Sequence, residues 1–286
     1  MTLSEYLEGQ KAGDEGIAKM FEAMSALQER LTGRIAEVLG DLEISGGTLV
    51  ASEANLARLA EVMQAIEAGF IDPQWERAVA DYLNTFDRLG KNTLEWGREL
   101  GTVSPGLLNA LQRQYKVVAA EYLLTAQSFS LTLLNPIAQE VASYIATGSR
   151  YSDLVRSVST IVTGGEDADG ALLGNARTAV NDLVSVYERT ATTVVSDAVG
   201  AEFFQYQGRP IDTTRPFCRA RAGKFFHRRD IESWADEEWG GKMKGTTPST
   251  IFNYLGGYNC RHVLIPVRQS AVPKEDLDRM RYKGLI

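Results

Sequence analysis

The chain has 286 residues, of which 44% are hydrophobic and 23% are charged, and these are the proportions of a soluble globular protein. Its two cysteines exclude a framework of several disulfides and fit a reducing compartment. The first eight residues show neither the basic start nor the apolar stretch of a secretion signal. The longest uncharged run, residues 122–139, contains too many polar residues for a membrane span, so we expect a buried helix there.

Charge divides the chain into two parts of opposite sign. Residues 205–286 contain 15 Lys and Arg against 9 Asp and Glu, which gives a net charge of +6. Residues 1–204 contain 15 basic against 28 acidic residues, which gives a net charge of −13. An acidic body joined to a basic end predicts two different partners.

The acidic part predicts a series of helices. Apolar residues recur every three or four positions from Thr2 to about Leu39, which is typical of one amphipathic helix. Ser52 is a suitable N-cap for a helix that ends at Gly69, and Pro73 and Pro105 each stand at the first position of a further helix. We expect the helix from Pro105 to bend or break at Pro136, and two more helices over residues 151–162 and 171–204. On the last of these, we expect one apolar side that includes Leu183 and Val194.

After residue 204 the pattern changes, because glycines and prolines divide the chain into short segments. The apolar runs Phe203–Tyr206 and His262–Val267 predict short strands, and Asp230–Glu238 predicts one small helix. We therefore expect an α+β protein with two domains. Residues 1–204 would form a mainly α-helical docking body, and residues 205–286 a small, basic α+β module.

The basic part contains every cysteine and histidine of the chain: Cys218, His227, Cys260 and His262. Cys260 and His262 are two positions apart, so on a strand they would point the same way, and with Cys218 and His227 they could form a tetrahedral zinc site. Three other interpretations stay open: buried thiols beside ordinary hydrogen-bonded histidines, a disulfide between the two cysteines, and a cysteine nucleophile activated by a histidine. Whether or not a metal ion lies between them, we expect Cys218, Cys260 and His262 to lie in one local cluster.

A second feature of this part is a run of cations with a single acid, Asp212, among them. Its members are Arg209, Arg215, Arg219, Arg221, Lys224, Arg228 and Arg229. So many close cations repel one another unless anions are near, which favours contact with the phosphates of double-stranded DNA without sequence preference. The alternative is a solvated face whose cations pair with acids of the helical body.

Two segments of the basic part, Thr213–Phe226 and Gly257–His262, carry a pair of motifs in a fixed order. The first contains Arg-Pro-Phe-Cys at residues 215–218 and Gly-Lys at residues 223–224, and the second contains Asn-Cys-Arg at residues 259–261. In this the chain resembles the phage head morphogenesis family, the minor head proteins named after the F protein of bacteriophage Mu. The resemblance covers roughly residues 175–267. It departs from the family pattern at His262, where the family has a second cysteine, and at residues 257–258, where it has His-Pro.

The resemblance implies a structural role rather than an enzymatic one. A protein of this family is expected in the virion, at the portal vertex of the phage head, after synthesis in the cytoplasm of the bacterial host. Its implied partners are the portal protein, the major capsid protein or both, and packaged double-stranded DNA. No membrane partner is implied, and the role is compatible with a homo-oligomer. The alternative is a nuclease or toxin effector that carries a similar module, although the basic part shows no recognisable constellation of catalytic carboxylates.

Overall fold

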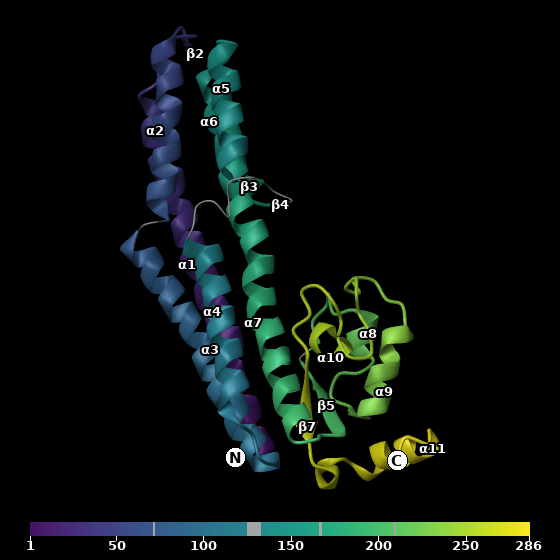
Figure 1. Cartoon of the computed structure of the whole chain (residues 1–286). Helices are drawn as coiled ribbons and strands as arrows, with labels where there is room; N and C mark the ends of the chain where they lie inside the picture. Colours follow the sequence, from purple (N-terminus) through teal and green to yellow (C-terminus); the bar gives the residue numbers. More distant parts are fainter. Residues whose placement is uncertain (71, 125–132, 166–167, 209) are drawn as a thin grey trace. The chain divides into compact units, whose positions relative to one another are not determined.

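The computed structural model describes residues 1–70, 72–124, 133–165, 168–208 and 210–286, and it has the expected α+β character (Figure 1). The helices of the first part of the chain are α1 Leu3–Gly40, α2 Glu53–Gly69, α3 Pro73–Leu100, α4 Pro105–Leu124, α5 Asn135–Ala146, α6 Tyr151–Thr163 and α7 Ala171–Ala198. The short strands between them are β1 Ile44–Ser45, β2 Thr48–Leu49, β3 Gly164–Gly165 and β4 Ala168–Asp169. The last third contains strands β5 Phe203–Gln207, β6 Phe225–His227 and β7 Val263–Val267, helices α8 Pro216–Arg219, α9 Arg228–Ser233, α10 Ile251–Tyr254 and α11 Lys274–Tyr282, and the 3-10 turns η3 Trp234–Asp236 and η4 Gln269–Ala271. No helix among the described residues has a stretch long and apolar enough to cross a bilayer.

The chain forms two compact units that do not follow the order of the sequence. The first consists of Met1–Glu15, Asn84–Val117 and Asn181–Ile286, and the second of Gly16–Leu83 and Val118–Val180. The boundary expected between residues 204 and 205 falls inside strand β5 and inside the first unit. A division into domains 1–204 and 205–286 in solution stays a prediction.

The second unit is built from amphipathic helices that bury one stripe each. Helix α2 begins where the Ser52 side chain accepts a hydrogen bond from the Asn55 backbone N–H, as its sequence predicts. Its buried face includes Val62 and Ile66. A buried hydrogen bond joins α3 to α4 inside this unit: the Trp75 indole N–H donates to the Leu123 carbonyl at 2.9 Å. This bond satisfies one carbonyl in the last turn of α4, which has no partner within its own helix.

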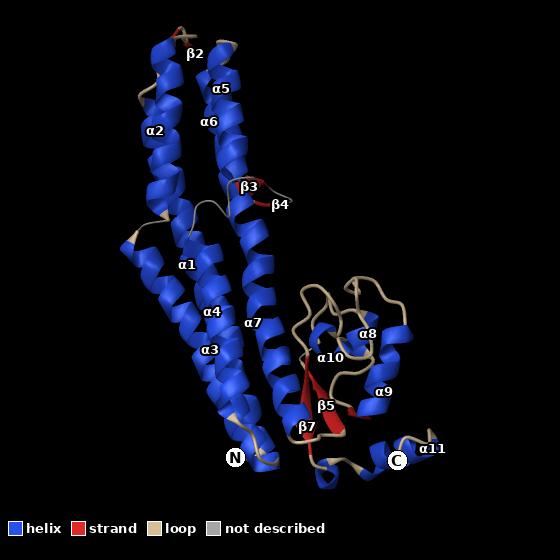
Figure 2. Ribbon diagram, in the orientation of Figure 1, coloured by secondary structure: helices blue, strands red, loops and turns tan. Residues whose placement is uncertain are grey.

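The first unit is organised around a three-stranded antiparallel sheet, whose strands β5 and β7 are labelled in Figure 2, and the strand order is β6-β5-β7. Strand β5 is central, with Phe203 opposite His227 on one side and opposite Val267 on the other. Because successive side chains of a strand point to opposite faces, each strand supplies two cores. Phe204 and Tyr206 pack on one face with residues of α8, α9 and α10, whereas Phe203 packs on the other face with Tyr6 and Trp96. The N-terminal turns of α1 and the end of α3 are thus part of the same unit as the sheet.

Two sequence predictions for the helices need correction. On α7 we expected the apolar stripe to pass through Leu183 and Val194, but these side chains are only partly buried and the core positions lie beside them, at Val184 and Val195. The helix is buried over a broad face, so a single stripe does not describe it. The small helix expected over Asp230–Glu238 begins earlier and ends earlier, as α9 followed by η3. Part of the run at residues 122–139 lies outside the described residues, and Pro136 stands in the first turn of α5.

Candidate metal centre

Cys218, Cys260 and His262 come together at one place in the first unit, although the two cysteines are 42 residues apart. Pro216 begins α8, and this short helix carries Cys218 into the core. Cys260 and His262 lie in the segment that leads into β7, directly after a turn in which Gly257 and Asn259 have φ values of 90° and 56°. All three side chains are buried, with 2%, 3% and 6% of their surface exposed.

The distances between their ligand atoms are those of a potential metal site. The Sγ atoms of Cys218 and Cys260 lie 3.9 Å apart, and Cys260 Sγ lies 3.7 Å from His262 Nδ1. One ligand atom from each residue falls within 4.8 Å of the other two, and among the described residues no other group of three or more such side chains meets this condition. Both cysteines are free thiols. The predicted local cluster is confirmed, and these three residues could hold a metal ion.

Two glycines make room for the ligand atoms. A Cβ atom on Gly256 would lie 2.2 Å from Cys218 Sγ and 3.0 Å from Cys260 Sγ, so both sulfurs lie directly against the backbone there. A Cβ atom on Gly208 would lie 2.4 Å from the imidazole ring of His262, at a residue whose φ of 147° is rare for other amino acids. Any side chain at either position would displace a candidate ligand.

Helix α7 places a buried arginine beside the cysteines. Arg189 is 1% exposed and donates from Nη1 to the Cys260 carbonyl at 2.8 Å. Its Nε and Nη2 have no hydrogen-bond partner among the described residues. No carboxylate of a described residue lies within 4.0 Å of its guanidinium nitrogens. A buried cation in this position favours a negative charge on the neighbouring sulfur.

The pKa values of the two thiols are therefore shifted in opposite directions. The hydrogen bond from Cys218, together with His262 and Arg189, holds the pKa of Cys260 well below its usual range. The same sulfur contact and the loss of water around it raise the pKa of Cys218. A bound divalent cation would favour the thiolate form of both sulfurs.

His262 is the least satisfied of the three residues. Its Nδ1 faces Cys260 Sγ, its ring lies 5.2 Å from that of Tyr206, and its buried Nε2 has no hydrogen-bond partner within the described part of the chain. Buried ring nitrogens are nearly always paired. A cation held between the two sulfurs and Nδ1 would satisfy that nitrogen, and Nε2 would still lack a partner among the described residues.

His227, the expected fourth ligand, is not part of this group. It lies opposite Phe203 on the sheet, whereas His262 directly precedes Val263, which lies opposite Gln207, so more than about 13 Å of β5 separates the two histidines. Its Nδ1 accepts a hydrogen bond from the Arg229 N–H and so caps α9. Burial lowers its pKa, and it serves as a neutral helix cap.

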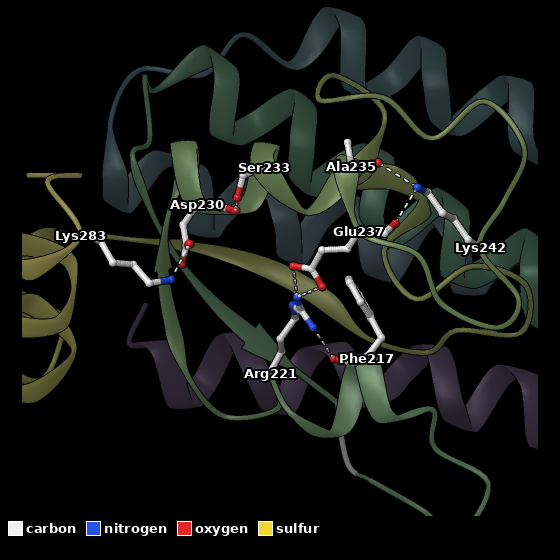
Figure 3. A network of polar contacts seen from close by, with 8 residues as sticks. All are labelled: Phe217, Arg221, Asp230, Ser233, Ala235, Glu237, Lys242 and Lys283. Carbon is white, nitrogen blue, oxygen red and sulfur yellow. Dashed lines mark hydrogen bonds and ion pairs between the residues drawn. The ribbon is translucent and has the colours of Figure 1, made fainter.

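The expected DNA-binding cations fall into two groups, and the first is neutralised by acids. Arg221 donates to both carboxylate oxygens of Glu237 and to the Phe217 carbonyl, and its guanidinium lies over the Phe217 ring (Figure 3). Arg228 pairs with Asp197 at 2.9 Å. These two arginines hold the module together and have little charge left for a phosphate.

The second group keeps its charge, because its hydrogen bonds go to neutral carbonyls. Arg219 donates to the carbonyls of Ile211 and Asp212, and Lys224 to that of Ala220. Arg229 donates to two carbonyls near the end of the chain, at residues 284 and 285. Arg215 makes no ion pair within 4.0 Å with a described carboxylate, and Arg209 lies outside the described residues. DNA binding by these cations stays a prediction.

None of the protein-family models, curated proteins and solved structures compared with this chain matches it. The site thus rests on its own geometry and on the motifs that the sequence carries. Sequence reasoning missed Arg189 and the two crowded glycines. A lone arginine in a helix gives no signal of its burial, but Gly256, four positions before Cys260, could have indicated a close approach of backbone to sulfur.

Proposed function

We propose that this chain is a bacteriophage minor head protein, a virion structural protein of the portal vertex that assists head assembly and contacts packaged DNA. The observation that supports this most is the meeting of the two motifs. Arg-Pro-Phe-Cys and Asn-Cys-Arg are separated by some forty residues in sequence, yet their cysteines lie side by side in the core of one small module. Motifs that fold together in this way are expected of a family signature that serves one structural purpose.

We propose further that the metal ion is zinc and that it acts as a structural clasp. In tetrahedral zinc sites with Zn–S distances of about 2.3 Å and Zn–N distances of about 2.0 Å, two sulfur ligands lie about 3.8 Å apart and a sulfur and a nitrogen about 3.5 Å apart. The observed 3.9 Å and 3.7 Å are close to these values. Zinc would join α8 to β7 at a module that has only a small core of its own.

Contact with DNA would fall to the cations that keep their charge, above all Arg219 and Lys224. Both are exposed and bonded only to carbonyls. Such contacts to phosphates are independent of sequence and weaken steeply with salt.

The zinc clasp is tested by elemental analysis of the purified full-length chain. We expect about one zinc per chain, and less than a tenth of that in the Cys260→Ser and His262→Gln variants. His227→Gln is the matched control, because this histidine lies outside the group, and it should retain the metal. Full metal content in both site variants, or none in the unaltered chain, would remove zinc from the proposal.

The head-protein role is tested by imaging intact particles that contain a labelled full-length chain. We expect density from the label at the single portal vertex. Label spread evenly over the capsid, or absent from particles, would contradict the proposed placement and would favour an effector or another role outside the head.

A further inference from the structure

A cavity of about 500 Å³ opens beside the candidate metal centre, within the first unit. Cys218, Cys260 and His262 all contribute to its lining, so it reaches the three candidate ligands. Most of the other residues that line it have polar side chains, among them Asp14 of α1, Asn181 of α7, and Arg215 and Arg261 of the two motifs. A cavity of this size holds a small molecule or several waters.

The metal centre has three protein ligands and no fourth among the described residues. Structural zinc sites are closed by four protein ligands, whereas sites with three keep one position for water or an exogenous ligand. Because the same three residues line the cavity, the remaining position of a tetrahedral ion would face it.

The charges of the lining favour an anion. Two guanidinium groups, Arg215 and Arg261, stand against one carboxylate, Asp14. Arg261 is held by the Asn181 side-chain oxygen at 2.7 Å, and Arg215 has no ion pair with a described acid and lies against Gly241. A divalent ion bound by two thiolates and a neutral imidazole adds no net charge, so the positive excess remains.

We propose that the metal centre is open to this cavity and binds a small oxyanion, such as a carboxylate, with one oxygen on the metal and Arg215 as its counter-charge. The proposal rests on the metal centre proposed above and gives it a ligand-binding role beyond that of a clasp. Arg215, three residues before Cys218 in the first motif, would then serve the cavity rather than DNA.

The test uses the full-length chain loaded with Co²⁺ in place of zinc, because the visible absorption of Co²⁺ reports its coordination. Acetate is titrated into the protein, with acetamide as an uncharged molecule of the same shape. We expect acetate to change the absorption bands in a saturable way and acetamide to leave them unchanged. Bands that respond to neither molecule, or equally to both, would overturn the proposal while leaving the clasp intact.

Three variants make the test specific to the cavity. Arg215→Gln should raise the Kd of acetate about tenfold or more, since a charge-assisted hydrogen bond is lost. Asp14→Asn should lower it, because the carboxylate that opposes the anion is removed. Lys244→Gln is the control, because Lys244 is exposed and lies outside the cavity lining. It removes one positive charge, as Arg215→Gln does, and should leave the Kd of acetate within about twofold of that of the unaltered chain. Equal effects of Arg215→Gln and Lys244→Gln would contradict the role of Arg215, and failure of Co²⁺ to bind at all would remove both this inference and the metal centre.

Discussion

At Gly256 the space that a side chain would need is already filled by sulfur. The residue has no positive φ, so the backbone itself would accept alanine, and only the contacts with Cys218 and Cys260 oppose it. A substitution at this position therefore tests the crowding of the two sulfur atoms without adding backbone strain.

We predict that Gly256→Ala lowers the free energy of unfolding by about 1–3 kcal/mol, because the new methyl group must push apart well-packed atoms. It should also lower the metal content, since either sulfur must move. The matched control is Gly33→Ala in α1, where a Cβ atom meets nothing within 4 Å and where alanine should stabilise the helix by up to about 1 kcal/mol. Urea denaturation and elemental analysis give both quantities. Equal stability changes in the two variants would show that the glycine at residue 256 is not needed for close contact.

Glu188, next to Arg189 on α7, predicts a dependence of stability on pH. Loss of water around its carboxyl, with a smaller effect of Asp14, raises its pKa to about 8. The folded protein thus keeps a proton that the unfolded chain releases near pH 4.5. The stability due to this group is fully present below pH 4.5 and falls as the pH rises towards 8.

Replacing Glu188 by glutamine should remove this dependence. We expect Glu188→Gln and the unaltered protein to have similar melting temperatures at pH 5, and the variant to be the more stable at pH 9. The difference should change by less than about 1.4 kcal/mol per pH unit, because the side chain is only partly buried. Parallel melting curves between pH 5 and 9 would mean that the carboxyl is ionised throughout.

At the scale of elements, Trp96 of α3 contacts both α1 and β7. The Trp96 indole N–H donates to the Pro266 carbonyl at 3.0 Å, and its ring stacks on that of Tyr6 at 5.3 Å. This single side chain connects two helices of the first part of the chain with a strand of the last part.

We predict that Trp96→Phe lowers the free energy of unfolding by about 1–2 kcal/mol, because the Pro266 carbonyl loses its donor while most of the ring packing remains. Trp96→Ala should lower it by about 3–5 kcal/mol. Tyr282→Phe, at a side chain that is 93% exposed, is the control and should have almost no effect. Chemical denaturation measures all three, and a Trp96→Phe variant as stable as the control would mean that the hydrogen bond contributes nothing.

The elements that could be predicted from the sequence are those with local signals. Ser52, Pro73 and Pro105 mark helix starts correctly, because a capping oxygen or a missing N–H acts within one turn. Strand β7 is also confirmed, from an apolar run. Strand β6 and the burial of α7 were not predictable, because they depend on partners that are distant in sequence.

The same limit applies to the site. Cys218, Cys260 and His262 were predicted to cluster because cysteine and histidine are so rare in this chain. His227 was grouped with them for the same reason, and only the antiparallel pairing of β6 with β5 shows that it belongs elsewhere. Composition can indicate which residues are candidate ligands, but the pairing register of the strands determines which of them lie close together.

For the molecule as a whole, the charge of the basic part is smaller than its composition suggests, since Arg221 and Arg228 pair with acids of the chain itself. We predict that replacing Arg219 and Lys224 together by glutamine weakens binding to double-stranded DNA and lowers the slope of log affinity against log salt by about 0.9 per lost phosphate contact. Replacing Arg221 and Arg228 should reduce stability and leave the slope nearly unchanged. Titrations of the full-length chain at several ionic strengths distinguish these results, and a larger slope change in the second pair would reverse the assignment.

The contact between Trp96 and Pro266 also has a consequence for how the protein is made. The two residues are 170 positions apart, and at about 5–20 residues per second a ribosome needs roughly 10–30 s to add the second after the first. During that time Tyr6 and Trp96 have no sheet to cover them. The nascent chain therefore carries an exposed aromatic surface until β7 has been made, which makes it a candidate client for chaperones that bind apolar segments on the ribosome.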